Sequence, residues 1–460
     1  MSSIQETFQI HWQNKHDPDF TCAHSFRLCA SFGEQECGNR LYWGDNLQVM
    51  IHLLDEYRNT IQMIYMDPPF DSDTDYKMRV SLHGDPKQSL IEQVQFSDIW
   101  SKDAYLQFIY ERLLVCRELL KEDGTLYIHC DPKRNYLIRC MMDEVFGEKC
   151  FINEIVWHYE KWTVKSGTGF QRNHDTILVY GKTGQPKFHV IKQVTENLKT
   201  KYKKGYLIGG GYGPKGLVVY DSDNAKVKKM IASGKYHVHY ADMKGKPLSD
   251  VWNIPFINPM ARERTGYPTQ KPEALLERMI EASTDRGDMI LDAFMGSGTT
   301  LAAAQTSGRH YIGIDSNRRA VQMTVKRLLQ CMPADHSAAF GIYADDDHKG
   351  LMDKKSFEID LSQSNGVLKV NCQVSDALLK QMHVPSKDYD WRWFVDAICI
   401  DWHFDGFVFK PSVYDIPSPN AQVLGEYPVP EHASDIVIYV ADIWGNTIFE
   451  PVRVSMCESL

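Results

Sequence analysis

Apolar positions in the first two thirds of the chain alternate between strand-like runs and helical spacing. Residues 61–66 form an apolar run that ends at Asp67-Pro68-Pro69-Phe70, which predicts a buried strand followed by a loop, because prolines interrupt strand pairing. Residues 101–122 have helical spacing, and residues 125–130 form the next strand. A similar succession returns after residue 272, with strands predicted at 289–294 and 310–315. The alternation predicts an α/β fold with a doubly wound, Rossmann-like and mostly parallel sheet.

Three segments break this rhythm and suggest the domain organisation. Residues 1–37 show no clear period and receive no predicted role. Residues 155–260 are rich in Lys, Tyr and Gly and predict an insertion into a core that spans residues 38–335. After residue 335 short β-rich runs are separated by Pro, Gly, Asn and Asp, so residues 336–460 are predicted to form a separate β-sandwich.

Charge is distributed unevenly along the 460 residues. The net charge is −9, yet residues 151–260 hold 17 Lys or Arg against 8 Asp or Glu. Residues 336–460 hold 9 Lys or Arg against 19 Asp or Glu. The basic segment can attract phosphates, whereas the acidic segment is expected to contact protein or solvent rather than nucleic acid.

The composition also argues against several classes of protein. No apolar run approaches the roughly 20 residues that a membrane span needs, and the N-terminus lacks the pattern of a secretory signal. The 11 cysteines include no CxxC pair, and no zinc spacing is found. We therefore expect a cytoplasmic protein with reduced cysteines, no metal site and no membrane association.

The first candidate site is the segment Asp292-Ala-Phe-Met-Gly296-Ser-Gly298-Thr299 between a predicted strand and a predicted helix. Glycines allow a ligand to approach the backbone, and a helix N-terminus favours an anionic group. Asp315 ends the next strand, where a carboxylate can accept hydrogen bonds from ribose hydroxyls. A dinucleotide fingerprint would need a third glycine at the position of Leu301, so a dinucleotide is disfavoured.

The second candidate site is Asp67-Pro68-Pro69-Phe70. An exocyclic base amine is a poor nucleophile, because its lone pair is delocalised into the ring. A carboxylate and the Pro68 carbonyl could accept its two hydrogens and aim the lone pair at an electrophilic methyl group. Phe70 could stack on a base removed from its duplex.

Together these motifs resemble the amino-methyltransferase family of DNA methylases, in the motif order of its beta group. Three further segments resemble segments of this family: Gly44-Asp45-Asn46-Leu47, residues 124–154 and Tyr267-Pro-Thr-Gln270-Lys271-Pro272. The similarity therefore spans roughly residues 38–330. It is similar in particular to modification subunits of type III restriction systems and to their stand-alone relatives.

The resemblance implies roles for individual residues. Asp67, Pro68, Pro69 and Phe70 would form the catalytic loop. S-adenosylmethionine would be the cofactor, bound by Asp45, Gln270, Lys271, Asp292, Phe294, Gly296, Ser297, Gly298, Thr299 and Asp315. Residues 155–260 would recognise double-stranded DNA, with Lys201, Lys203 and Lys204 on phosphates and with aromatic residues such as Trp157, Tyr159, Trp162, Tyr202, Tyr206 and Tyr212 stacking on bases.

The function that follows is methylation of adenine N6 in DNA, in restriction-modification or phage defence. The resemblance implies a homodimer and a possible nuclease subunit as partner. Two alternatives remain open: an N4-cytosine methyltransferase, which the Asp of DPPF disfavours, and a DNA-binding subunit without catalysis, which the two intact motifs disfavour.

Overall fold

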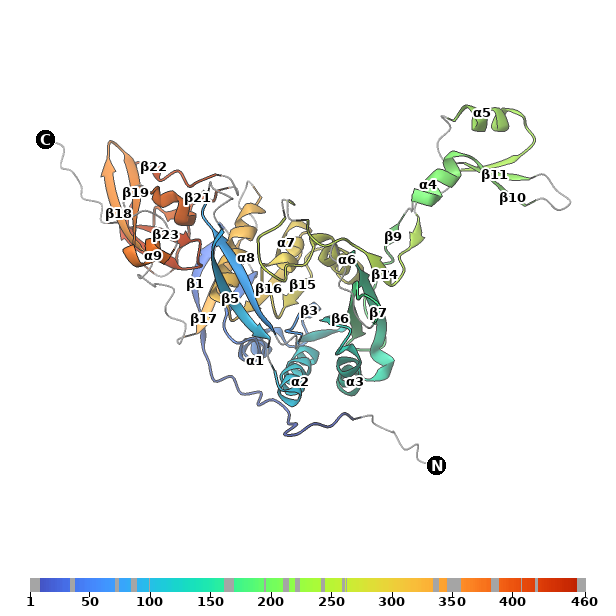
Figure 1. Ribbon diagram of the computed structural model, residues 1–460, viewed down its shortest axis with the longest axis horizontal. Helices are drawn as coiled ribbons and strands as arrows, with labels where there is room; N and C mark the ends of the chain where they lie inside the picture. The colour runs from blue at the N-terminus through green and yellow to red at the C-terminus, as the bar shows by residue number, and fades with distance from the viewer. Residues whose placement is uncertain are drawn as a thin grey trace. The chain divides into compact units, whose positions relative to one another are not determined.

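A ten-stranded mixed sheet organises most of the chain in this computed structural model (Figure 1). Its strand order is β1-β17-β2-β16-β15-β3-β6-β8-β7-β14. The bounds, in chain order, are β1 Phe26–Phe32, β2 Arg40–Trp43, β3 Ile61–Met66, β6 Leu120–Cys130, β7 Phe151–His158, β8 His174–Gly181, β14 Val251–Asn253, β15 Met289–Asp292, β16 His310–Asp315 and β17 Phe340–Asp345.

The structure describes residues 9–33, 38–70, 74–83, 89–98, 100–160, 169–193, 196–209, 215–219, 224–240, 245–258, 261, 263–333, 339–345, 357–381, 389–406, 408–417 and 421–452. Contacts between residues divide the chain into two compact units. Unit 1 comprises residues 1–187 and 251–460, and unit 2 comprises residues 188–250.

The centre of the sheet is parallel. Strands β17, β2, β16, β15, β3 and β6 pair in parallel, whereas β1 and β8 are antiparallel to their inner neighbours. The predicted α/β architecture is therefore confirmed at the level of a mixed sheet with a parallel centre.

Helices cover both faces of this sheet. Side chains of α1 (Asn46–Tyr57), α2 (Lys102–Leu119) and α3 (Asn135–Phe146) share one buried cluster with Ile64 and Met66 of β3. Side chains of α6 (Glu273–Ser283), α7 (Thr299–Thr306) and α8 (Arg318–Gln330) share another with Met63 and Tyr65. Successive residues of β3 thus face opposite layers, as a strand buried on both sides requires.

Both ends of the predicted core need correction. β1 lies inside the segment 1–37 that received no role, and it forms one edge of the sheet against β17. β17 lies inside the segment 336–460 that was predicted to be a separate domain, yet it pairs with β2. Local patterns did not reveal these pairings, because they join residues about 300 positions apart in the chain.

A long hairpin follows the Asp67–Phe70 loop and was not predicted. Its strands β4 (Thr74–Ser81) and β5 (Ser89–Asp98) pair from Thr74 with Asp98 to Ser81 with Ser89. Figure 1 shows the long β5 between the C-terminal strands, near which it begins, and the region of β3, near which it ends.

The C-terminal strands form two sheets, here called the C-terminal sheets. One is β18-β19-β22 (Phe357–Ser364, Val367–Val374, Glu426–Pro428), and the other is β21-β20-β23-β24 (Val413–Asp415, Val395–Asp401, Ile436–Asp442, Thr447–Val452). A short helix, α9 (Asp376–Gln381), follows β19. Leu368 and Tyr427 of the first sheet share a buried cluster with Ile398 and Ile438 of the second. The expected β-rich composition is present.

The C-terminal sheets are not separate from the core, which corrects the prediction. Alternate residues of β20 and β23, including Cys399 and Tyr439, belong to the same buried cluster as Phe32 and Phe340 of the ten-stranded sheet. The amide of Ser31 also donates to the carbonyl of Phe409 at 3.0 Å. The four-stranded sheet is therefore buried on both faces.

Unit 2, here called the inserted unit, runs from Phe188 to Asp250 and is shorter than the predicted insertion at 155–260. It contains a sheet β10-β11-β12 (Tyr206–Ile208, Gly216–Val219, His237–Tyr240), the helices α4 (Glu196–Lys203) and α5 (Ala225–Ala232), and the pair β9-β13 (Lys192–Gln193, Lys246–Pro247). At its base Leu248 N–H donates to the carbonyl of Ile191 at 3.0 Å. Lys201, Lys203 and Lys204 are exposed on and just after α4.

Two aromatic residues proposed for base stacking are core residues. Trp157 is fully buried in β7, where its indole N–H donates to the carbonyl of Ile254 at 2.8 Å, and Tyr159 is also buried. Because β7 and β8 belong to the main sheet, these side chains pack rather than stack on bases. Trp162 and Tyr212 lie outside the described residues, whereas Tyr206 is exposed.

Within the described ranges no helix combines the length and apolar character that crossing a bilayer requires.

The contact between the C-terminal sheets and the core generates a stability prediction. Phe409 is 1% exposed, and its ring centroid lies 5.1 Å from that of Phe449 and 6.1 Å from those of Phe32 and Tyr439. Phe409→Ala is expected to lower the free energy of unfolding by about 3–5 kcal/mol. Phe188→Ala, at a side chain 57% exposed, should change it by less than about 0.5 kcal/mol. Urea denaturation measures both, and equal effects would show that the sheets fold apart from the core.

Candidate active site

The two candidate loops meet because their strands are neighbours. β15 pairs in parallel with β3, with Asp292 opposite Tyr65, so the residues that follow both strands emerge at the same edge of the sheet. A cavity of about 280 Å³ lies there, close to the lower end of ligand pockets. Of the residues predicted for the catalytic loop and the cofactor site, all except Gly298 line this cavity. The lining residues are Asp45, Asp67, Pro68, Pro69, Phe70, Gln270, Lys271, Asp292, Phe294, Gly296, Ser297, Thr299 and Asp315.

Gly298 is needed for a reason other than ligand approach, which corrects the interpretation of this glycine. Its φ is +72°, a left-handed conformation at the start of α7, and a β-carbon there would lie 2.7 Å from the side chain of Thr324 in α8. Gly296 also has a positive φ, +48°, and does line the pocket. Gly298 therefore lets the loop pack closely against α8.

Asp315 accepts two backbone hydrogen bonds at the end of β16. Gly296 N–H donates to Oδ2 at 2.9 Å and Asn317 N–H to Oδ1 at 2.8 Å. Burial raises the pKa of this carboxyl to about 6, although the two N–H groups act in the opposite direction. Since a carboxylate has about four lone-pair sites, it can still accept hydrogen bonds from a ligand.

Asp292 is almost fully buried at the end of β15. Phe294 N–H donates to its Oδ1 at 3.0 Å. Burial raises its pKa to about 7, with a further increase from the charges of Asp67 and Asp315. The pocket thus brings several carboxyl groups together without enough cations to balance them.

Asp67 is held between a lysine and a histidine. Lys271 Nζ donates to Oδ2, while Oδ1 lies 4.0 Å from Nδ1 of His129. His129 is fully buried at the end of β6, and it also contacts the hydroxyl of Tyr65 at 3.1 Å and Asp175 at 3.3 Å. The lysine and the histidine thus approach different oxygens of the carboxylate.

Phe70 is fixed by its backbone and by its neighbours. Its N–H donates to Oδ2 of Asp98, at the end of β5, at 3.1 Å. Its ring lies 5.6 Å from the ring of His129 and 5.5 Å from Lys271 Nζ. An aromatic face is therefore available beside the carboxylate of Asp67.

Asp45 and Gln270 have structural partners as well as a place in the pocket. Asp45 is the N-cap of α1 and pairs with Arg112 at 3.2 Å, yet its side chain remains 56% exposed. Gln270 accepts from Thr265 N–H at 2.8 Å and donates to the carbonyl of Glu263, so it shapes the loop before α6.

Sequence reasoning missed several residues of the pocket. They are Asn46, Tyr65, Tyr76, Asp98, Trp100, Phe108 and Tyr267. His129 was also missed, and it contacts Asp67, Tyr65 and Phe70. The signal for His129 and Tyr65 was available, because each lies near the carboxyl end of a predicted parallel strand. Tyr76 and Asp98 gave no such signal, since the hairpin that carries them was not predicted.

The chemistry of this pocket suits a cationic adenosine derivative better than a polyphosphate. Among the described lining residues five are Asp, and Lys271 is the one Lys or Arg. Carboxylates accept hydrogen bonds from ribose hydroxyls and attract a positive charge, and the aromatic residues can contact a purine. These groups therefore fit S-adenosylmethionine, whose sulfonium is positively charged.

Comparison with known proteins places the chain in the same class. Residues 61–326 match the family model described as DNA methylase. The match runs from β3 to α8 and includes both loops of the pocket, so the chain belongs to this family of DNA methylases. Methylases of this family use S-adenosylmethionine, as the resemblance implied.

Curated relatives support this assignment. The Mod subunit of the StyLTI type III restriction-modification enzyme from Salmonella typhimurium is 29% identical over 324 residues, 58% of this chain and 49% of that subunit. The type II methyltransferase M.HpaI of Haemophilus parainfluenzae is 30% identical, over 59% of this chain and 68% of its own. The DNA adenine methyltransferase YhdJ of Escherichia coli is 27% identical, over 58% of this chain and 76% of its own length. The match thus spans about half the length of the Mod subunit.

Among solved structures, the cytosine-N4-specific PvuII DNA methyltransferase matches with 17% identity and a TM-score of 0.41, covering 68% of this chain and 94% of that one.

The raised pKa of Asp315 generates a prediction on cofactor binding. If its carboxylate accepts the ribose hydroxyls, protonation turns an acceptor oxygen into a donor. The dissociation constant of S-adenosylmethionine should then rise as pH falls through about 6, approaching about tenfold per pH unit. Calorimetric titration between pH 5 and 8 measures this, and Asp315→Asn should remove the part of the dependence that belongs to this group. An affinity that is independent of pH in the wild type would contradict the assignment.

Proposed function

We propose that this protein methylates N6 of adenine in DNA, with S-adenosylmethionine as methyl donor. The observation that carries the proposal is that Asp67-Pro68-Pro69-Phe70 and the Asp292–Thr299 loop line one carboxylate-rich pocket. The family match supports DNA as the substrate class. Adenine is favoured by the Asp of the catalytic loop and by the named activity of YhdJ.

In this proposal different residues of the pocket bind the cofactor and the target amine. S-adenosylmethionine, when bound, supplies an electrophilic methyl group. Asp315 and Asp45 would hold its ribose and adenine, and the loop around Phe294 and Gly296 its methionine part. Asp67 and the Pro68 carbonyl would accept the two amine hydrogens, so the nitrogen lone pair is localised where the transfer occurs.

The surroundings of Asp67 support its role as acceptor. Lys271 holds Oδ2, which leaves Oδ1 toward His129 as the freer oxygen. When the amine gains a methyl group it must lose one proton, and Oδ1 is the proposed first acceptor. Phe70 would stack on the extrahelical base, because its ring is held beside the carboxylate.

The inserted unit is the proposed DNA-contacting segment. It contains 12 Lys and 5 Asp or Glu, a clear excess of positive charge. Lys201 lies 3.6 Å from the centroid of the exposed Tyr206 ring, which combines a cation and an aromatic face at one place. Such pairs suit contact with phosphates and bases.

Partners are also part of the proposal. The relatives include Mod subunits of type III restriction-modification enzymes. On that basis we propose a homodimer that works with a nuclease subunit in restriction-modification or phage defence. Light scattering of the purified protein tests the dimer, and co-purification from the native host tests the nuclease.

The catalytic proposal predicts that Asp67→Ala abolishes methyl transfer, because the amine lone pair is no longer localised. The expected loss is at least about a hundredfold in kcat, measured as incorporation of labelled methyl groups into DNA from a methylase-free host. The variant should still bind the cofactor and melt near the wild-type temperature, which separates lost chemistry from lost fold. Activity within tenfold of wild type would contradict the mechanism.

Mass spectrometry of the hydrolysed wild-type product identifies the base. N6-methyladenine is the expected product. N4-methylcytosine would identify the protein as the alternative N4-cytosine methyltransferase. The absence of both methylated bases would favour a DNA-binding subunit without catalysis.

The DNA-contact proposal predicts that reversing Lys201, Lys203 and Lys204 to Glu weakens DNA binding and flattens its salt dependence. Each lost phosphate contact should lower the slope of log K against log salt by roughly 0.9. Fluorescence anisotropy across a salt series measures both quantities. The matched control reverses Lys226, Lys228 and Lys229 of α5, which are also exposed in the inserted unit. If the two triple variants behave alike, DNA contact is not localised to α4.

A further inference from the structure

The β4–β5 hairpin joins the catalytic loop to the C-terminal sheets. Its paired strands extend over roughly 25 Å at the usual rise per residue. One end carries Tyr76 and Asp98, which line the active-site pocket. The other end carries Leu82 and His83, which contact the C-terminal sheets and their flanking turns, as described next.

At the pocket end, the hairpin holds the backbone of the catalytic loop. Asp98 is fully buried and pairs with Thr74 across the hairpin. Its Oδ2 accepts the N–H of Phe70 at 3.1 Å. The neighbouring Pro68 and Pro69 have no N–H, so this bond is a main polar restraint on the last residue of the loop.

At the far end, the hairpin is docked by both apolar and polar contacts. Leu82 is 4% exposed and shares a buried cluster with Phe394 and Ile443. His83 N–H donates to the carbonyl of Trp393 at 3.0 Å, and its Nε2 lies 2.6 Å from Oδ1 of Asp396. Asp396 belongs to β20, one of the two inner strands of the four-stranded C-terminal sheet.

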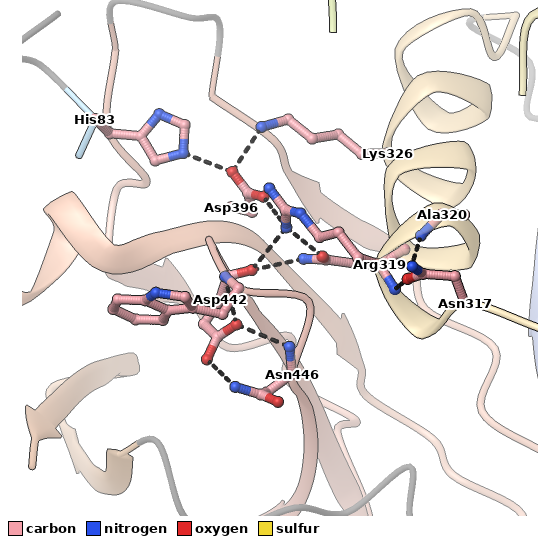
Figure 2. A network of polar contacts seen from close by, with 10 residues as sticks. His83, Asn317, Arg319, Ala320, Lys326, Asp396, Asp442 and Asn446 are labelled. Carbon is pink, nitrogen blue, oxygen red and sulfur yellow. Dashed lines mark hydrogen bonds and ion pairs between the residues drawn. The ribbon is translucent and has the colours of Figure 1, made fainter. Parts of the chain in front are cut away.

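Asp396 also binds α8, the helix that follows Asp315 at the end of β16, as Figure 2 shows. Arg319 Nη1 lies 3.0 Å from Oδ2 and Lys326 Nζ 2.9 Å from Oδ1. Both residues belong to α8, whose N-cap Asn317 comes two residues after Asp315. One carboxylate therefore contacts both the hairpin that holds the Asp67–Phe70 loop and the helix that follows Asp315.

This carboxylate is 5% exposed, so its charge is costly to bury without partners. Burial acts to raise its pKa, but Lys326, Arg319 and His83 hold that pKa well below the ordinary value. A packed apolar side chain could stabilise the same interface at lower cost. Three directional partners instead define one geometry for the two elements that meet there.

We propose that Asp396 is a positioning residue for methyl transfer, which sets the Asp67–Phe70 loop and the Asp315 end of β16 relative to each other through His83 and Arg319. The proposal rests on the proposed function for its kinetic part only. It also gives the C-terminal sheets, which lie outside the family match at 61–326, a role in the reaction.

The test compares Asp396→Asn with Asp401→Asn. Asp401 is an equally buried carboxylate on the same strand, but it accepts from the backbone N–H groups of His403 and Lys410. Neither of these donors belongs to the hairpin or to α8, so Asp401 controls for general damage to the sheet. His83→Ala is the second variant, since it leaves Asp396 paired with Arg319 and Lys326.

Hydrogen–deuterium exchange of the Phe70 amide reads the position of the catalytic loop directly. A short peptide that covers the loop reports this amide clearly, because two of its neighbours are prolines. Asp396→Asn and His83→Ala are expected to accelerate its exchange about tenfold or more, and Asp401→Asn to leave it unchanged. This measurement needs neither DNA nor cofactor, so it remains informative even if the proposed function fails.

Kinetics supply the second readout. Asp396→Asn should lower kcat by about tenfold to a hundredfold, since small misplacements of reacting groups have effects of this size. Its KM for DNA should stay within about threefold of wild type. His83→Ala should leave the affinity for S-adenosylmethionine unchanged, whereas Asp396→Asn should weaken it, because only the latter releases α8.

Two results would overturn the proposal. In the first, Asp401→Asn accelerates Phe70 exchange as much as Asp396→Asn, which would reduce the effect to loss of sheet stability. In the second, Asp396→Asn and His83→Ala both leave Phe70 exchange and kcat at wild-type values. If Asp396→Asn does not fold, His83→Ala alone decides between these outcomes.

Discussion

The parallel pairing of β3 with β15 is the constraint on which the active site depends. These strands are far apart in the sequence, but their ends lie at one edge of the sheet, with Asp292 opposite Tyr65. The Asp67–Phe70 loop and the Asp292–Thr299 loop therefore meet at one pocket, although they are far apart in the sequence. Lys271, which precedes α6, then reaches across to Asp67. Asp315 is placed in the same way, because β16 pairs in parallel with β15, whereas Tyr76 and Asp98 come from the β4–β5 hairpin.

The pocket is electrostatically incomplete without a ligand. Asp292 and Asp315 are buried, and burial raises the pKa of both carboxyl groups because their charged forms are poorly solvated. Backbone N–H groups compensate in part, but Lys271 is already engaged with Asp67. A cationic cofactor would balance this excess of negative charge. The buried carboxyl groups that are costly in the free protein would therefore favour binding of such a cofactor.

Much of the site could be predicted from the sequence, because short motifs coincide with the ends of parallel strands. Strand β16 was predicted with its observed bounds, and the Asp67–Phe70 loop follows β3 as expected. What failed were long-range pairings. An apolar run such as β17 looks the same whether it joins a C-terminal sandwich or the main sheet, and the partner decides. Trp157 was misassigned for the same reason, since an aromatic residue in a basic segment gives no sign of a buried strand beneath it.

The residue roles were less predictable than the residue positions. Gly298 was recognised as special, but its close neighbour is Thr324 of α8, a contact that no local motif encodes. Tyr76 and Asp98 depend on a hairpin whose strands carry no strong alternation of apolar and polar residues. Its importance comes from what its two ends touch, which only the tertiary structure reveals.

The base of the inserted unit has an evolutionary consequence. β9 pairs with β13, and Leu248 bonds to Ile191, so the chain enters and leaves the unit at adjacent points. The gene segment that encodes the chain between them could be exchanged as one piece, while the ten-stranded sheet keeps its connections. Loop length is a weak constraint on such an exchange, because doubling it costs only about 0.6 kcal/mol in closure entropy. If the inserted unit contacts DNA as proposed, exchange of this one segment would change the recognition sequence and leave the active site of the ten-stranded sheet unchanged.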